Sequence, residues 1–236
     1  GTVHSSYLAS IYNQDDAFDW DFGWRAENQF WVAIQEQGFD PSNRGFESDG
    51  AHSGNLNAAI FSKPQIYNMT LIGSTAAGTA NATDHNAMFF TENSGALINN
   101  SIIMGFGQGI SITDVGGTNG NSRDRLTAGD LAFKNNIWAS VADNTVAGIS
   151  NGLASLQTYL ADPANGNEIS TTPGIGITAT SFTVLPAAGS LALTKSRVAL
   201  PPPNGFTYVT ADFVGAFGTS NWLKGWTAAD EYGFLP

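Results

Sequence analysis

Three segments of the chain share a pattern in which apolar residues flank an asparagine at fixed spacing. They are PQIYNMTLIG (64–73), ALINNSIIMG (96–105) and LAFKNNIWAS (131–140), and they align Asn68, Asn100 and Asn135. The aligned asparagines lie 32 and 35 residues apart along the chain. An internal repeat constrains the fold strongly, because each unit must stack on a similar unit to bury its apolar side chains.

The repeat predicts an all-β fold, a right-handed parallel β-helix. In each unit two short strands would meet at a bend, where asparagine tolerates the left-handed backbone conformation and its amide can bond the next asparagine in a ladder. Successive units would stack as parallel strands about 4.8 Å apart. Strand-like stretches at 5–12, 28–35, 87–93 and 109–114 extend the stack to about five coils. The insertions at 74–87 and 114–128 are expected to form side loops that carry recognition.

The character of the sequence changes after residue 142. Ile149, Leu153, Leu156 and Leu160 recur at helical spacing, which predicts one short helix that ends before Asp162. The residues beyond it are irregular but rich in Phe, Trp and Tyr. We therefore expect two regions of one structural body. Residues 1–142 would form the coils and their loops, and residues 143–236 the helix and an aromatic cap across an open end of the stack.

The charge balance excludes several classes of function. A net charge of -11 with only nine Lys and Arg argues against sequence-independent binding of nucleic acid, which requires a basic surface. The absence of cysteine excludes disulfides and thiol nucleophiles. No apolar run approaches the roughly 20 residues of a membrane-spanning helix, so we expect no transmembrane segment.

The stretch DDAFDWDFGW (15–24) places four carboxylates among large aromatic residues. Asp15, Asp16, Asp19 and Asp21 could supply the hard oxygen ligands that Ca²⁺ prefers. One alternative is a structural corner, in which the carboxylates accept backbone N–H bonds above packed aromatic rings. The other is a catalytic acid cluster.

Glu47 and Asp49 in GFESDG (45–50) form a second acidic group. If one coil separates them from residues 15–24, they would lie about 5 to 10 Å from the first group, within reach of a shared ion. We therefore predict a Ca²⁺ site and no organic cofactor. Arg25 and Arg44 would form ion pairs with these carboxylates if no ion is bound. The predicted ligands are Asp15, Asp16, Asp19, Asp21, Glu47 and Asp49.

Other candidate residues are scattered along the chain. His4, His52 and His85 show no metal-binding spacing, although Asp84 next to His85 could form a ligand pair. Trp222 and Trp226 could stack on a sugar, or they could be buried as an anchor of the cap.

Several segments together resemble a known family. YNQDDAFDWDFGWRAENQFWVAIQ, GFESDG, PQIYNMTLIG, INNSIIMGFGQGISI and GAFGTSNWLKGWTAADEYGFLP are similar to secreted right-handed parallel β-helix proteins of Bacteroidetes and other Gram-negative and marine bacteria. The resemblance covers nearly the whole chain and implies that it is the C-terminal part of such a protein. It implies no established activity.

These observations predict an extracellular or outer cell-surface β-helix scaffold or binding protein, of adhesion or assembly type, stabilised by Ca²⁺. Its expected partners are another protein chain at the N-terminal edge of the helix, as a homo-oligomer or filament, or a surface glycan. The alternative is a polysaccharide lyase or glycoside hydrolase that acts in a groove along the helix. A lyase would need a basic residue, for which Arg123 and Arg125 are the candidates; no residue is assigned a catalytic role.

Overall fold

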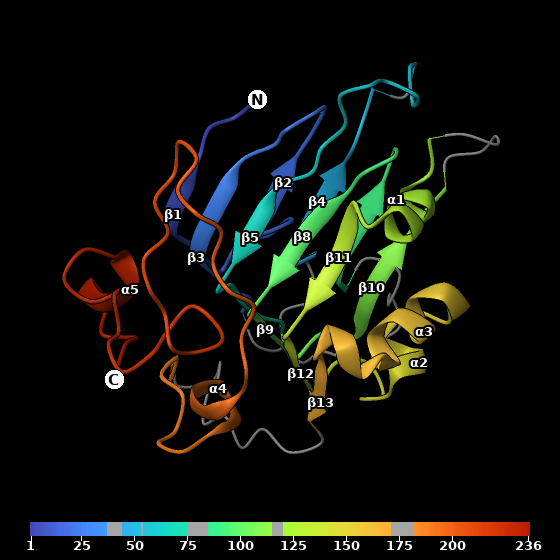
Figure 1. Ribbon diagram of the computed structural model, residues 1–236. Helices are drawn as coiled ribbons and strands as arrows, with labels where there is room; N and C mark the ends of the chain where they lie inside the picture. The colour runs from blue at the N-terminus through green and yellow to red at the C-terminus, as the bar shows by residue number, and fades with distance from the viewer. Residues whose placement is uncertain (37–43, 53, 75–84, 115–119, 171–181) are drawn as a thin grey trace.

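The computed structural model describes residues 1–36, 44–52, 54–74, 85–114, 120–170 and 182–236. Strands dominate, and the helices are short (Figure 1). The strands are β1 (Ser5–Ile11), β2 (Phe18–Trp20), β3 (Glu27–Ile34), β4 (Phe46–Asp49), β5 (Gln65–Tyr67), β6 (Thr70–Ile72), β7 (Asn86–Thr91), β8 (Ala96–Asn99), β9 (Ile102–Met104), β10 (Gln108–Ile112), β11 (Leu131–Lys134), β12 (Ile137–Ala139) and β13 (Glu168–Ser170). The helices are α1 (Ser122–Ala128), α2 (Val146–Ile149), α3 (Ala154–Ala161), the 3₁₀ turn η1 (Pro163–Asn165), α4 (Leu191–Thr194) and α5 (Ala228–Glu231).

The strands of the described residues form two parallel sheets. The smaller sheet has the order β10-β7-β4-β2, and the larger has the order β11-β8-β5-β3-β6-β9-β12-β13, with β1 paired to β3. Each passage along the chain places one strand in the smaller sheet and then contributes to the larger one: β2 precedes β3, β4 precedes β5 and β6, β7 precedes β8 and β9, and β10 precedes β11 and β12. This recurrence is what a parallel β-helix requires. The handedness and the number of five coils remain predictions.

The predicted bend lies where the repeat places it. Asn68, Asn100 and Asn135 have φ values of 54°, 52° and 54°, which is the left-handed region. The strand register aligns them in one column with Phe30 (φ 59°) and Tyr7 (φ 58°), whose strands β3 and β1 continue through the bend. The bend is therefore a property of every strand in the column, and asparagine is, after glycine, among the residues that tolerate it best.

The side chains at this column do not form the expected amide-to-amide ladder. Asn68 Nδ2 donates to Phe213 O at 2.8 Å, and Asn100 exchanges two hydrogen bonds with the backbone of Val198, at 2.9 and 2.8 Å. Both amides thus bind the C-terminal segment.

The coils are instead linked by polar side chains one residue further along the chain. Ser101 Oγ accepts from Met69 N, Asn136 Oδ1 from Ser101 N, and Asn167 Oδ1 from Asn136 N. Each of these bonds joins a side chain of one coil to the backbone of the coil before it.

The main core fills the space enclosed by the two sheets. It contains aromatic residues from successive coils, including Trp20, Trp31, Phe46, Phe90, Phe133 and Trp138. Phe46, Phe90 and Phe133 follow one another edge to face, with centroid distances of 5.4 and 5.8 Å. Edge-to-face contact is one of the favoured arrangements of neighbouring aromatic rings.

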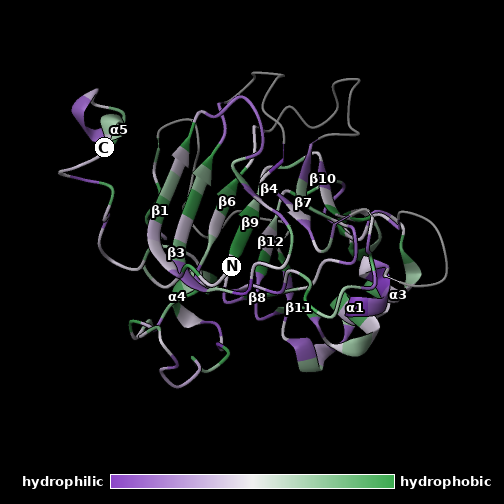
Figure 2. Cartoon of the chain, turned by 90° about the horizontal axis from the view of Figure 1, so that it is seen from above, coloured by the Kyte–Doolittle hydropathy of each residue, from purple (hydrophilic) through white to green (hydrophobic). Residues whose placement is uncertain are grey.

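A second core lies on the outer face of the larger sheet, and the position of the tail differs here from the expected cap. Val32, Ile34, Ile72, Ile102 and Ile137 point outward and are covered by Val214, Phe217, Leu223 and other apolar residues of the C-terminal segment. Figure 2 shows the green of hydrophobic residues on β3 and β9. The tail therefore covers a lateral face, because these strands are apolar on both faces and cannot be left in water.

The predicted single helix is two helices. Ile149, Leu156 and Leu160 are buried in the main core as expected, but Asn151 (φ 48°) and Gly152 (φ 76°) break the helix between α2 and α3. These helices lie at the end of the stack away from β1 (Figure 1). The division at residue 142 needs correction, because β13 pairs with β12 and continues the sheet beyond it. Part of the expected loop 114–128 is helix α1, while 75–84 and 115–119 lie outside the described residues.

The corner predicts a measurable stability effect. Asn100→Ala forces alanine into the left-handed region, at about 1–2 kcal/mol, and removes two hydrogen bonds worth about 0.5–1.5 kcal/mol each. We expect a loss of about 2–5 kcal/mol in the free energy of unfolding, measured by denaturant titration. Asn100→Gly adopts the left-handed conformation without strain but lacks the same two hydrogen bonds. It should therefore lose less stability than Asn100→Ala, by the energy of the strain. Equal losses in the two variants would contradict a strained corner.

Candidate functional site

The two predicted acidic groups lie side by side on the outer face of the smaller sheet. β2 pairs in parallel with β4 in the register Asp19 to Glu47 and Trp20 to Ser48, which places Asp21 next to Asp49. Trp20 and Phe46 point into the main core, so by strand alternation Asp19 and Glu47 point outward. The condition for a shared site, that one coil separates the two groups, is met.

The carboxyl groups are arranged as two hydrogen-bonded pairs. Glu47 pairs with Asp16, which precedes β2, and Asp49 pairs with Asp21; in each pair a protonated carboxyl donates to the other. These contacts link one strand to the next, at the spacing of about 4.8 Å between neighbouring strands. We call Asp16, Asp19, Asp21, Glu47 and Asp49 the acidic face.

One arginine lies within the acidic face. Arg44 forms ion pairs with Asp16, at 3.3 Å, and with Glu47. Its backbone N–H also donates to Asp16 Oδ1 at 2.8 Å, and its guanidinium lies 4.3 Å from the centre of the Phe89 ring. Arg25 is different: its Nε donates to Phe61 O at 2.8 Å and its guanidinium stacks on Phe61. Of the two expected ion-pair donors, Arg44 alone takes that role.

The electrostatics of the face favour protonated carboxyls. Burial raises the pKa of Glu47 to about 8, with further contributions from the hydrogen bond to Asp16, while Arg44 opposes the shift. Burial and the hydrogen bond to Asp21 raise the pKa of Asp49 to about 7. The pKa of Asp19 is raised by burial and by the charges of Asp21 and Asp16. Clusters of carboxyls with pKa values shifted toward neutrality are typical of functional sites.

Among the described residues, no group of three or more His, Cys, Asp or Glu side chains is arranged as a ready-made metal site. The carboxyls stand in pairs. Asp15 is exposed, and its backbone carbonyl accepts from the Asn13 amide. The predicted ligands Asp16, Asp19, Asp21, Glu47 and Asp49 thus share one face of the sheet as neighbouring pairs, with Asp15 at the margin.

The other candidates have structural contacts. His4 Nδ1 accepts from Glu27 N, His52 Nδ1 accepts from Gly54 N, and the predicted partner of His85 lies outside the described residues. Arg123 pairs with Asp114 at 2.7 Å and Arg125 with Asp130 at 3.2 Å, so both basic residues bind carboxylates outside the acidic face.

Trp222 and Trp226 stack at 6.2 Å. Trp222 is half-buried against the second core, on the outer face of the larger sheet, whereas Trp226 is 61% exposed. The alternative in which both residues are buried as an anchor of the cap therefore applies to Trp222 only.

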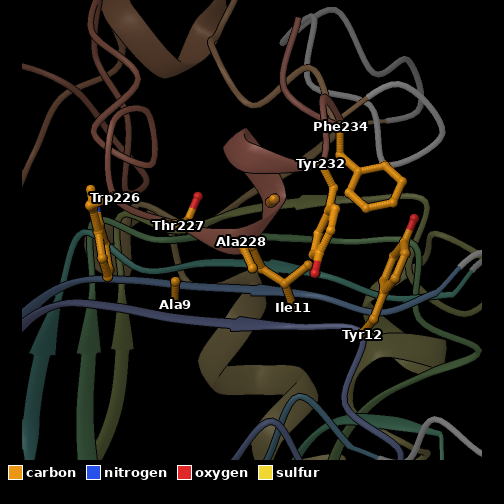
Figure 3. A pocket seen from close by; sticks show the side chains of 9 residues that line it. Ala9, Ile11, Tyr12, Trp226, Thr227, Ala228, Tyr232 and Phe234 are labelled. Atoms are coloured by element: carbon orange, nitrogen blue, oxygen red, sulfur yellow. The ribbon is translucent and has the colours of Figure 1, made fainter.

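A pocket that the sequence did not indicate lies between β1 and α5 (Figure 3). Its volume is about 400 Å³, and its walls include Ile11 and Tyr12 on one side and Trp226, Tyr232 and Phe234 on the other. More than 200 residues of sequence separate the two walls. No local pattern links them, and only the fold brings them together.

Comparison with known proteins identifies the architecture. A family model described as a pectate-lyase-like β-helix domain matches residues 1–183. No curated protein and no solved structure matches the chain. The described part of the chain contains no helix long and apolar enough to cross a membrane.

The shifted carboxyls predict a pH-dependent stability. The ordinary pKa values of Glu47 and Asp49 are 4.5 and 3.8, and in the folded protein they are raised to about 8 and about 7. At a pH between the ordinary and the raised values, the folded protein therefore keeps protons that the unfolded chain has released. The stability that these bound protons contribute is fully present at a pH below the ordinary pKa values. It is lost as the pH rises through the pKa values of the folded protein. We expect the free energy of unfolding, measured in EDTA, to fall between about pH 5 and about pH 9.

In the variants Glu47→Gln and Asp49→Asn the free energy of unfolding should change less with pH. At the higher pH each variant should be more stable than the unmodified protein. Glu231→Gln, which changes an exposed carboxyl outside the acidic face, is the control. A free energy of unfolding that rises with pH over this range would contradict the raised pKa values.

Proposed function

The chain belongs to the pectate-lyase-like β-helix family, and we propose that it is an extracellular β-helix binding protein whose acidic face binds Ca²⁺. The observation that supports this proposal is the stacking of Asp19 and Asp21 on β2 against Glu47 and Asp49 on β4. The β-helix serves as the scaffold, and the face is its ligand site.

The charges of the face favour a cation. Five carboxyl groups stand near the guanidinium of Arg44, which forms ion pairs with Asp16 and Glu47. A divalent cation would relieve the repulsion among the remaining carboxylates when they lose their protons. The net charge of -11 adds a long-range attraction for cations.

The spacing of the face also suits a large cation. Oxygen ligands lie about 2.3–2.6 Å from Ca²⁺, so two carboxylates on strands about 4.8 Å apart can bind one ion between them. Asp19, Asp21, Glu47 and Asp49 would hold it, with Asp16 beside Arg44 at the edge. Bridging two neighbouring coils, the ion would stabilise the stack.

Calorimetry tests this site. We expect the EDTA-treated protein to bind Ca²⁺ with a saturable heat and to melt at a higher temperature in its presence, because the ion binds the folded face only. Asp49→Asn removes one charged ligand and should weaken binding by about tenfold or more. Asp212→Asn changes an exposed carboxyl elsewhere and should bind as the unmodified protein does. No heat of binding together with an unchanged melting temperature would refute the proposal.

A second candidate, a glycoside hydrolase, has one specific observation in its favour. Residue positions directly opposite on β2 and β4 are about 5 Å apart along the backbone, and diagonal positions, such as those of Asp19 and Asp49, are about 8 Å apart. These separations fall near those of retaining and inverting glycosidases, about 5–5.5 and 6.5–9.5 Å. Glu47, with a pKa of about 8, would be the general acid. Elimination is less favoured, because Arg44, Arg123 and Arg125 are all in ion pairs.

Assays with neutral and acidic polysaccharides separate the two functions. A hydrolase would release reducing ends, with a loss of about 100-fold or more in Glu47→Gln because the general acid is removed. A lyase would release unsaturated uronides. Release of neither product by the Ca²⁺-loaded protein, across substrates that it binds, would leave the binding function as the only one of the two.

A further inference from the structure

Three basic side chains gather where the chain passes from the smaller sheet to the larger one. Arg25 lies before β3, Lys63 lies before β5, and Arg125 lies in α1, which packs against β11. The strands β3, β5, β8 and β11 follow one another across the larger sheet (Figure 1). Three of the nine Lys and Arg residues of a chain with a net charge of -11 thus meet at one place. We call Arg25, Lys63 and Arg125 the basic cluster.

The register of the strands explains why these residues meet. β3 pairs with β5, β5 with β8 and β8 with β11 in a register that places Arg25, Lys63, Gly95 and Asp130 at equivalent positions of successive coils. Because Gly95 has no side chain, Lys63 can reach across it, and its Nζ lies 2.7 Å from Asp130 Oδ1. The column therefore brings together charges from coils that are not direct neighbours.

A buried aromatic ring positions the two arginines. The guanidiniums of Arg25 and Arg125 both lie over the ring of Phe61, at 4.6 and 4.4 Å from its centre. The two guanidinium carbons are therefore about 9 Å apart or closer. Arg25 Nε also donates to Phe61 O at 2.8 Å. Stacking uses the flat face of a guanidinium and leaves the N–H donors at its edge available for an anion.

The positive charge of the cluster is only partly balanced. Among the described residues, its ion pairs use one carboxylate, because Asp130 binds both Lys63, at 2.7 Å, and Arg125, at 3.2 Å. Burial would raise the pKa of Asp130, but Lys63 and Arg125 hold it below its usual value, so this carboxyl is ionised. Arg25 is exposed, and its side chain donates to a carbonyl, which carries no net charge. Three cations therefore face one anion.

The basic cluster lies within the stack and not at its end. Arg25 N donates to Gly1 O in the coil before it at 2.8 Å, whereas the side chain of Arg25 extends the other way, to Phe61 in the coil after it. Beyond β11 the stack continues, because Asn135 N donates to Asn165 O at 2.8 Å. The contacts that form the cluster thus join coils that have neighbours on both sides.

We propose that the basic cluster binds a tetrahedral oxyanion, a sulfate or phosphate group, between Arg25, Lys63 and Arg125. The three donors come from different turns and approach a bound group from different directions. A sulfate or phosphate group offers three or more oxygens to them, whereas a carboxylate offers two, and Asp130 already supplies a carboxylate to Lys63 and Arg125. The group is either a free ion or an ester on a polysaccharide. No residue of the acidic face takes part, so this inference does not rest on the Ca²⁺ site.

Calorimetric titration with two probes tests the proposal. Dextran sulfate carries the group as an ester on a sugar chain, sodium sulfate carries it as a free ion, and neutral dextran is the blank. EDTA is present throughout, so that no Ca²⁺ links the polymer to the acidic face. We expect saturable binding of dextran sulfate to the full chain, weakening as NaCl is added, and no binding of dextran.

The two sulfated probes distinguish the source of the group. Tighter binding of dextran sulfate, per sulfate, would assign the site to an esterified group, and equal binding of sodium sulfate would assign it to a free ion. Absence of binding by both probes at low salt would overturn the proposal.

Substitutions within the cluster should have effects of opposite sign. Arg25→Gln removes one cation and should weaken the binding of dextran sulfate by about tenfold. Asp130→Asn removes the carboxylate that competes for Lys63 and Arg125, so it should strengthen binding by about threefold or more. Arg197→Gln is the matched control, because it changes an exposed arginine of the C-terminal segment and should bind as the unmodified protein does.

Two results would contradict the assignment. Unchanged binding in folded Arg25→Gln would place the anion elsewhere on the protein. Weaker binding in folded Asp130→Asn would show that its carboxylate supports the site and does not compete with the anion. Circular dichroism and the melting temperature confirm that each variant is folded, and Lys63→Gln, with the same expected loss, takes the place of Arg25→Gln if that variant does not fold.

Discussion

The structure depends on a column of left-handed residues at one corner of the stack. Tyr7, Phe30, Asn68, Asn100 and Asn135 share this conformation and lie in register along neighbouring strands. A parallel stack tolerates no slip of one residue, because a slip would turn every inward side chain outward. The corner and the apolar residues beside it therefore set the register of the larger sheet. Through the continuous chain they also constrain the smaller sheet, where the acidic residues lie.

The acidic face is a consequence of this register. Asp19 and Glu47 occupy equivalent positions in successive coils, as do Asp21 and Asp49, and alternation along the strands turns them away from Trp20 and Phe46. Half-burial and mutual repulsion then raise the pKa values of Glu47 and Asp49. A stack of coils can thus concentrate carboxyls at a fixed spacing, provided that a proton, a cation or Arg44 compensates their charge.

The larger sheet carries a second consequence of the repeat. Its strands are apolar on both faces, so the main core and the C-terminal segment must cover them from opposite sides. The corner asparagines join the two layers, because Asn68 and Asn100 bond to the backbone of Phe213 and Val198. The amides of Asn68 and Asn100, which were expected to bond one another, bind the outer layer. Links between coils come from Ser101, Asn136 and Asn167, and Asn68 Oδ1 also accepts from Gln29 Nε2 of the coil before it.

The sequence by itself determined the repeat, the strands on either side of each asparagine, the left-handed corner and the proximity of the two acidic groups. These follow from local preferences and from a spacing that recurs, and both are visible along the chain. The tertiary structure alone decided that the tail covers a lateral face, that Asp16 pairs with Glu47 and Arg44, and that Trp226 and Tyr232 meet the edge of β1. The physical reason is that these contacts join segments without a shared period. Their partners are selected by the shape and polarity of surfaces that exist only after the coils have stacked.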